Sequence, residues 1–130
     1  MIEPEKIAAI LDRVRQIPIV DTLKMGEFTF NDGVCEVMVP RQRAFDGVFE
    51  SFHGGILMTI ADSIACFAVL TRTSADQVLT TTDMHIRFLA PRLTDVIAKA
   101  RVIKFGRVLC PVAVEIFDTH GTMVAVAQVN

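Results

Sequence analysis

The sequence predicts an α+β fold in which a curved antiparallel sheet surrounds one long central helix. Residues 52–70 have the pattern of a helix that is apolar on every face and carries one formal charge, Asp62. The C-terminal half consists of short β-type runs separated by turn residues. A helix with no polar face must be covered, so the strands that follow it are expected to wrap around it.

Two elements precede this helix. Residues 4–16 are expected to form an amphipathic helix, because a proline suits its first turn, Pro18 ends the pattern, and apolar residues recur at helical spacing. Met25 to Phe30 and Val34 to Val39 alternate in polarity around Asn31-Asp32-Gly33, which is a strong hairpin signal. A loop of mixed charge over residues 40–51 then leads to the long helix.

The sheet is completed after the long helix. Four more strands are expected, over Val78–Leu89, Asp95–Lys104, Val108–Phe117 and Thr122–Val129. Phe105-Gly106-Arg107 and Asp118-Thr119-His120-Gly121 are expected to be turns between them. Pro111 interrupts one strand and predicts a bulge or an edge strand there, because proline cannot donate to the ladder.

Length and composition restrict the class of protein. A chain of 130 residues fits a single domain, and its 52% apolar content is high enough to predict a large surface buried between subunits. The net charge of −2 argues against nucleic acid as the main partner. Three cysteines without CxxC spacing indicate reduced thiols in the cytoplasm. The acidic, amphipathic N-terminus is unlike a signal peptide, and the glycines and Asp62 in residues 52–70 argue against a membrane span.

The start of the long helix carries the first chemical signal. His53-Gly54-Gly55 leaves the first turn almost without side chains, so backbone N–H groups at the positive helix end are open to an incoming group. An isolated carboxylate such as Asp62 is costly among apolar residues unless it is paired. The bare helix end and this carboxylate are together half of an acyl-transfer site. A structural Asp62 that caps a neighbouring loop is the alternative.

Helical spacing places small or polar residues on the face of the helix that carries the carboxylate: Gly55, Thr59, Asp62 and Cys66.

Other catalytic arrangements have little support. No Ser or Cys nucleophile lies in a triad-like pattern. His85 and His120 stand alone, and no histidine spacing resembles a metal site. No metal is therefore expected.

The run HGGILMTIAD, which begins at His53 and ends at Asp62, resembles the hotdog-fold acyl-CoA thioesterases of the phenylacetate-degradation (PaaI-like) group. The later run TTDMHIRFLAPR and the strand pattern of the C-terminal part resemble the same family, so the resemblance covers about residues 20–130. It implies one hotdog domain over residues 1–130, which includes the N-terminal amphipathic helix. It also implies homodimers, often paired into tetramers, with active sites at the subunit interface.

The resemblance implies roles for the residues of the motif. Asp62 would attack the thioester carbonyl or activate the water that does, facing the HGG turn of the other subunit. The N–H of Gly54 would stabilise the oxyanion. Gly55 would permit close packing, and His53 would shape the turn. Thr81 would orient the attacking water. Thr82 in the neighbouring register, or a purely structural threonine, is the alternative.

The chain departs from the family just before the motif. Several relatives carry an Asn six residues before the histidine and a Gly three residues before it, where this chain has Gly47 and Glu50. The Asn helps to polarise the thioester, and other relatives do carry Gly at its position. Glu50 would assist the base, repel anionic substrates or face solvent.

Substrate contacts are also implied. The phosphates of coenzyme A would be held by Arg92, Lys104 or Arg107, for each of which a solvated surface charge is the alternative. The acyl group would lie between the helix and the partner's sheet, beside Met58, Phe67, Phe88 or Phe49. No separate cofactor is expected, since coenzyme A is part of the substrate. The acyl group itself stays open among aromatic, short-chain and medium-chain acids.

Three alternatives to an acyl-CoA thioesterase remain at this point. A hotdog dehydratase or hydratase would bind similar thioesters but needs a His and an acid beside the carbonyl. A non-catalytic acyl-CoA sensor and a degenerate site kept for assembly are the others.

Overall fold

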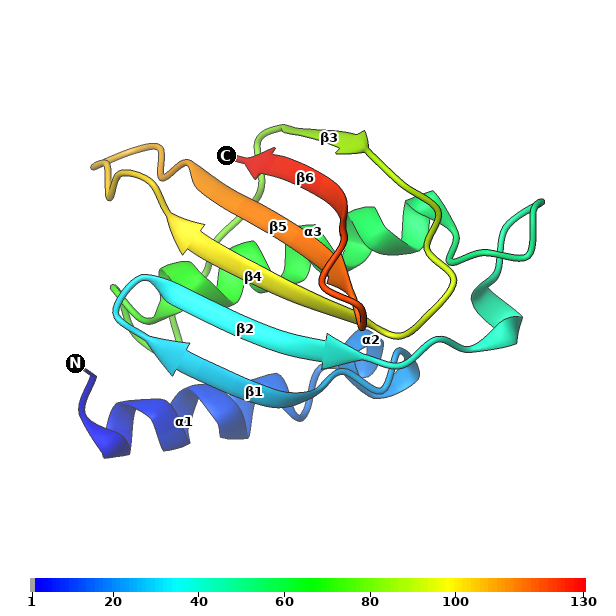
Figure 1. Cartoon of the computed structure of the whole chain (residues 1–130). Helices are drawn as coiled ribbons and strands as arrows, with labels where there is room; N and C mark the ends of the chain where they lie inside the picture. Colours follow the sequence, from blue (N-terminus) through cyan, green and yellow to red (C-terminus); the bar gives the residue numbers. More distant parts are fainter. Residues whose placement is uncertain (1) are drawn as a thin grey trace.

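The computed structural model describes residues 2–130 and contains one open antiparallel sheet laid across a long helix (Figure 1). The strand order is β1-β2-β4-β5-β6-β3. The elements are α1 (Pro4–Val14), α2 (Pro18–Thr22), β1 (Gly26–Asn31), β2 (Val34–Val39), η1 (Arg43–Phe45), α3 (Gly54–Leu70), β3 (Met84–Phe88), β4 (Val96–Val102), β5 (Val112–Asp118) and β6 (Met123–Val129). The predicted class, an antiparallel sheet around one central helix, is confirmed.

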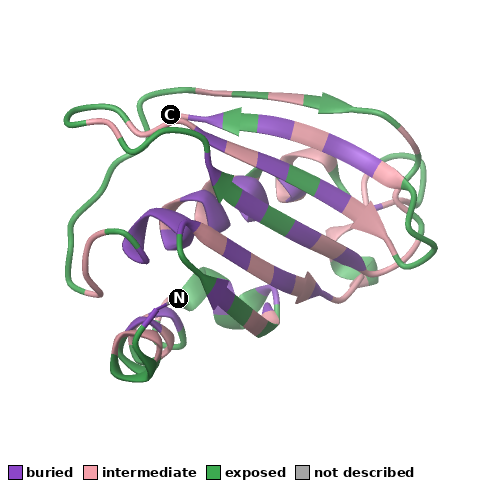
Figure 2. Ribbon diagram, turned by 60° about the vertical axis from the view of Figure 1, so that its left-hand side comes forward, coloured by how far each residue is buried: buried purple, intermediate pink, exposed green. Residues whose placement is uncertain are grey.

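The core lies between α3 and the concave side of the sheet. Buried and less buried residues alternate along β4 and β5, as Figure 2 shows, so that one face of each strand points at the helix. The buried residues of α3 include Leu57, Ile60, Ala61, Ile64, Ala65, Phe67 and Ala68. Within residues 2–130, no helix has both the length and the apolar character needed to cross a membrane.

The C-terminal end of α3 is fixed to the β1–β2 hairpin. Gly33, at a φ of 71°, donates its N–H to Thr71 Oγ1 over 2.7 Å, and this hydroxyl in turn donates to the carbonyl of Ala68. Arg72 Nε forms an ion pair with Asp32 Oδ1 at 2.8 Å. The hairpin turn and the helix end are thereby held in one position, which fixes where the helix lies across the sheet.

The helical elements differ from the prediction near the N-terminus. Helix α1 ends at Val14, and a second short helix, α2, follows where only an end to the pattern was expected. Pro18 is the first residue of α2, because a proline that cannot continue one helix is well placed in the first turn of the next. The side chain of Arg13 donates to the carbonyls of Ala75 and Gln77, which ties α1 to the loop after α3.

The predicted strand Val78–Leu89 is shorter in the structure, where only β3 over Met84–Phe88 is paired. The Thr82 N–H donates to the carbonyl of Asn130, just beyond β6. Residues 78–81 extend past the end of β6, so the described chain offers them no neighbouring strand.

The β4–β5 connection is longer than predicted. The loop runs from residue 103 to 111, and β5 starts directly after Pro111. The expected bulge or edge at Pro111 is wrong, since β5 lies between β4 and β6 and its irregularity is at Ile116/Phe117. A proline just before a strand is tolerated because no ladder N–H is required of it.

Candidate active site

His53 shapes the turn at the start of α3. It is the N-cap residue, and its Nδ1 accepts a hydrogen bond from the Gly55 N–H at 2.8 Å. A Cβ at Gly55 would lie 3.0 Å from the ring of His53, so a side chain there would disturb the cap. A Cβ added at Gly47 would lie 3.5 Å from Cδ2 of the same histidine. The glycines therefore let the backbone close around one imidazole.

Gly54 presents an unused donor at this helix end. Among residues 2–130, no acceptor meets its N–H, whereas the N–H groups of Gly55 and Ile56 are both engaged. A Cβ on Gly54 would lie 3.0 Å from Cζ of Phe88, whose half-exposed ring covers the turn. A free N–H at the positive end of a helix is suited to stabilise an oxyanion.

The loop before α3 is held by two arginines. Arg41 donates Nε and Nη2 to the two carboxylate oxygens of Asp46, at 3.1 and 2.7 Å, and also donates to the carbonyls of Glu50 and Leu93. The Arg41 guanidinium thereby lowers the pKa of Asp46. Arg92, expected to contact phosphate, donates Nε and Nη2 to the carbonyl of Phe52.

Arg92 also lies 5.0 Å from the centre of the Phe88 ring, which places this ring over the turn. The backbone of Phe52 donates to the carbonyl of Arg92, and that of His53 donates to Phe45. These contacts therefore hold the loop before α3, the Phe88 ring and the start of α3 in fixed positions relative to one another.

Asp62 lies on the half-buried face of α3 and has one side-chain partner. Thr81 Oγ1 donates to Asp62 Oδ1 over 2.5 Å. Thr82 Oγ1 instead donates to the carbonyl of Asn130, so the structure brings Thr81, and not Thr82, to the carboxylate. The stripe predicted on α3 is present, since Gly55, Thr59 and Cys66 are also half-buried.

The two parts of the predicted site do not meet within one chain. Gly54 and Asp62 are eight residues apart on one helix, and a rise of 1.5 Å per residue separates them by about 12 Å along its axis. A single thioester carbonyl cannot contact both groups at this separation. Within one chain, the free N–H of Gly54 and the carboxylate of Asp62 are therefore too far apart to act on the same carbonyl.

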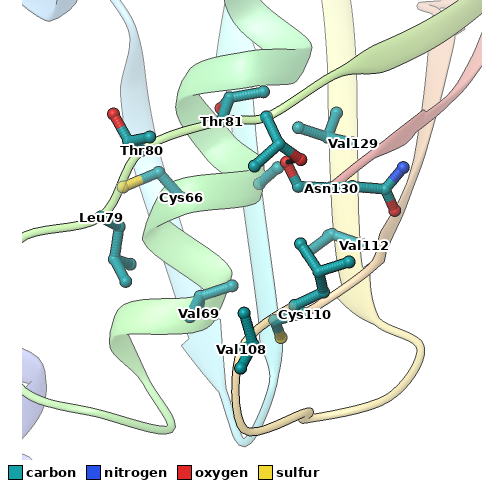
Figure 3. Close-up of a pocket in the computed structure, with 13 residues that line it drawn as sticks. Cys66, Val69, Leu79, Thr80, Thr81, Val108, Cys110, Val112, Val129 and Asn130 are labelled. Atoms are coloured by element: carbon teal, nitrogen blue, oxygen red, sulfur yellow. Dashed lines mark hydrogen bonds between the residues drawn. The ribbon is translucent and has the colours of Figure 1, made fainter.

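A cavity of about 120 Å³ lies between the second half of α3, the segment before β3 and the β4–β5 loop (Figure 3). Thr81 lines it as well as contacting Asp62. The other lining residues come from the second half of α3, the segment before β3, the β4–β5 loop and the ends of β5 and β6: Ala65, Cys66, Val69, Leu79, Thr80, Thr82, Val108, Leu109, Cys110, Val112, Val129 and Asn130.

The aromatic residues predicted to line an acyl slot against the partner's sheet do not line this cavity. Phe67 is buried in the core, where its ring packs edge-on against Phe28 at 6.0 Å. Met58 and Phe49 are exposed, and neither they nor Phe88 line the cavity. Val69 lines the cavity and was not predicted to do so, because periodicity cannot separate the core face of an all-apolar helix from its cavity face.

The basic residues of the β4–β5 loop are exposed, and two cysteines line the cavity. Arg107 and Lys104 are exposed on the β4–β5 loop, and neither lines the cavity. Burial raises the pKa of the Cys66 and Cys110 thiols, so neither supplies a thiolate at neutral pH. In the described part of the chain, no three His, Cys, Asp or Glu side chains converge to hold a metal ion.

Comparisons with known proteins agree with this geometry. Residues 49–125, more than half of the chain, match the family model described as the thioesterase superfamily. In a comparison of sequences alone, no curated protein matches. Among solved structures, the PaaI protein of the phenylacetic acid degradation operon of E. coli is 19% identical, with a TM-score of 0.83, covering 96% of this chain and 88% of that one.

Two further solved structures share the architecture. A phenylacetic acid degradation-related protein from Ralstonia eutropha is 24% identical, with a TM-score of 0.80 and coverage of 93% and 96%. The thioesterase HI1161 from Haemophilus influenzae is 20% identical, with a TM-score of 0.82 and coverage of 92% and 84%. At these identities the likeness establishes the hotdog fold, as the sequence resemblance predicted.

Proposed function

Since the chain belongs to the thioesterase superfamily, we propose that it is an acyl-CoA thioesterase that hydrolyses its substrate to a carboxylic acid and free coenzyme A. The observation that carries the proposal is the Thr81–Asp62 contact at the mouth of an uncharged cavity. A cytoplasmic location belongs to the proposal and is supported by the three free cysteines.

In this mechanism Asp62 is the base or the nucleophile. As a base, it takes a proton from a water molecule held by Thr81 while the water oxygen attacks the thioester carbonyl. As a nucleophile, it forms an anhydride that water then cleaves. In both routes the carbonyl oxygen becomes negative, a helix-terminal N–H such as that of Gly54 stabilises it, and the thiolate of coenzyme A leaves.

The active oligomer is proposed to be a homodimer, or a tetramer made of two such dimers. The separation of Gly54 from Asp62 supports a site shared between two chains, the helix end of one facing the carboxylate of the other. Strand β3 is at a sheet edge, with unpaired backbone groups on one side. Large apolar side chains are exposed near it and near the start of α3: Val48, Phe49, Met58, Val78, Phe88 and Leu89.

The test is release of free coenzyme A from a panel of acyl-CoAs by the wild type and by Asp62→Asn. We expect the variant to lose at least a hundredfold in kcat while keeping its thermal stability and oligomeric state. Glu115→Gln, the same change of carboxylate to amide at an exposed position of β5, is the matched control and should stay fully active. Equal activity of wild type and Asp62→Asn would remove Asp62 from the chemistry.

A non-catalytic acyl-CoA-binding protein is the second candidate. Gly47 favours it, because it stands at the position where the resemblance implies, for several relatives, an Asn that polarises the carbonyl. Calorimetry separates the two functions: micromolar binding of an acyl-CoA by the wild type without any release of coenzyme A would support the sensor and contradict the enzyme.

A further inference from the structure

We propose that Arg92 is a positioning residue for the oxyanion donor at the start of α3. Its guanidinium holds the Phe52 carbonyl and the Phe88 ring in place, so that the Gly54 N–H stays free of an internal acceptor and shielded from water. The inference rests on the proposed thioesterase function and adds to it a residue that acts through its neighbours.

Arg92 binds both backbone groups of Phe52, the residue just before the N-cap of α3. Its Nε and Nη2 donate to the Phe52 carbonyl at 3.2 and 3.0 Å, and its own carbonyl accepts from the Phe52 N–H at 2.8 Å. Phe52 is buried, so its carbonyl needs a partner. Without Arg92, this carbonyl is free to accept from N–H groups three or four residues later, which would begin the helix one residue earlier and redirect the Gly54 N–H.

The same guanidinium fixes the ring that lies against Gly54. Its Cζ is 5.0 Å from the centre of the Phe88 ring, a distance at which a cation is attracted to the ring face. Phe88 is the last residue of the edge strand β3 and is 43% exposed, so the contact with Arg92 is needed to fix its ring. A Cβ placed on Gly54 would lie 3.0, 3.3 and 3.4 Å from three carbons at the tip of this ring, which therefore covers the helix start.

Arg92 has the charge and the shape for this role. Within residues 2–130 no carboxylate pairs with it, since the ion pairs are those of Arg41 with Asp46 and of Arg72 with Asp32. Its side chain is instead committed to a carbonyl and a ring face, both beside the free N–H. A planar guanidinium can donate two N–H groups to one carbonyl while it stacks on a ring, which the point charge of a lysine cannot do.

The first experiment measures kcat and KM for release of coenzyme A by Arg92→Met and Arg92→Lys. Removal of one oxyanion donor typically lowers kcat by about a hundredfold to a thousandfold, so a misplaced donor should lower kcat by about tenfold or more in Arg92→Met, with KM changed by less than about threefold. Arg92→Lys should show the same loss, because it keeps only the charge. Arg101→Met, at an exposed arginine of β4, is the matched control and should equal the wild type.

A proline at Gly54 tests whether Arg92 acts through the Gly54 N–H. Gly54 is the first residue of α3, and His53 before it is extended with a ψ of 132°, so Gly54→Pro removes the N–H without breaking the helix. Gly54→Ala adds a Cβ but keeps the N–H, and is the matched control. Gly54→Pro should have the lower kcat of the two by about tenfold, and adding Arg92→Met to Gly54→Pro should cost less than about threefold more.

A second measurement does not depend on turnover. The chain has seven glycines, so labelling glycine alone with a heavy nitrogen isotope gives few amide signals, and the one missing from Gly54→Pro is that of Gly54. In Arg92→Met this amide should exchange with solvent about tenfold faster than in the wild type. Phe88→Leu keeps the bonds of Arg92 to Phe52 but removes the ring. It should also show faster exchange and a lower kcat, and it tests the inference if Arg92→Met does not fold.

The outcomes separate this inference from the proposed function. A wild-type kcat in Arg92→Met or Arg92→Lys would overturn the inference and leave the thioesterase intact. A loss from Arg92→Met that is undiminished beside Gly54→Pro, or an unchanged Gly54 amide, would also overturn it. Faster exchange of Gly54 in Arg92→Met, without turnover of any acyl-CoA by the wild type, would support the positioning role and refute the enzyme. No turnover together with an unchanged amide would refute both.

Discussion

Glu50 adopts a backbone conformation that its side chain disfavours. Its φ is 56°, in the left-handed region that favours glycine. A non-glycine residue there costs about 1–2 kcal/mol. Replacement by glycine removes this cost but adds freedom to the unfolded chain, which costs about 0.4–1 kcal/mol. Glu50→Gly should therefore stabilise the protein by about 0.5–1 kcal/mol.

The assay is thermal unfolding at matched protein concentration, because an oligomer unfolds at a temperature that depends on concentration. For a chain of this length the unfolding entropy converts the gain into a rise in Tm of about 2–4 °C. Glu50→Ala is the matched control. It removes the same carboxylate but keeps a Cβ, so its Tm should stay near that of the wild type.

Two results would refute this reasoning. Equal rises in Tm for Glu50→Gly and Glu50→Ala would assign the effect to the carboxylate and not to the backbone. A fall in Tm for Glu50→Gly alone would mean that the left-handed conformation carries no cost in this loop. The side chain of Glu50 is exposed to solvent, so we expect neither variant to change kcat.

The remaining predictions concern the carboxylates. Thr81→Val removes the hydroxyl that donates to Asp62. Because the site is exposed, loss of this hydrogen bond to a charged group should lower kcat about tenfold with little change in KM. Thr29→Val, at an exposed position of β1, is the control; equal losses in both would contradict the role. Asp46→Asn should lower Tm at pH 7, because Arg41 lowers the pKa of Asp46 and this stabilisation is present above the unfolded pKa of about 3.9. The difference should vanish as the pH falls below that value, and a constant difference down to pH 3 would exclude the ion pair.

Much of the fold could be predicted from the sequence because its signals are local. The apolar run of α3, the Asn31-Asp32-Gly33 turn and the Asp118–Gly121 turn each specify their own conformation. In the last of these, Asp118 Oδ1 accepts from the backbone N–H groups of His120 and Thr122, and Gly121 has a φ of 85°. The true length of β3 was out of reach, because it depends on where β6 ends.

The candidate site was predictable in part for the same reason. His53, Gly54 and Asp62 lie on one helix at fixed spacing, so their relation follows from the sequence. The choice between Thr81 and Thr82 depends on how the segment before β3 crosses α3. The ion pair of Arg41 with Asp46 closes a loop whose path no periodicity describes, and the cavity joins segments that are far apart in the chain.

The distance between Gly54 and Asp62 also bears on how faults in this protein would be inherited. If each reaction centre takes its helix end from one chain and its carboxylate from the other, a substitution in one chain damages a centre to which the partner chain also contributes. Two chains with faults in different halves can still assemble one intact centre in a mixed dimer, whereas each faulty chain alone assembles none. Complementation between alleles, which a site contained in one chain cannot show, would then be a property of this helix.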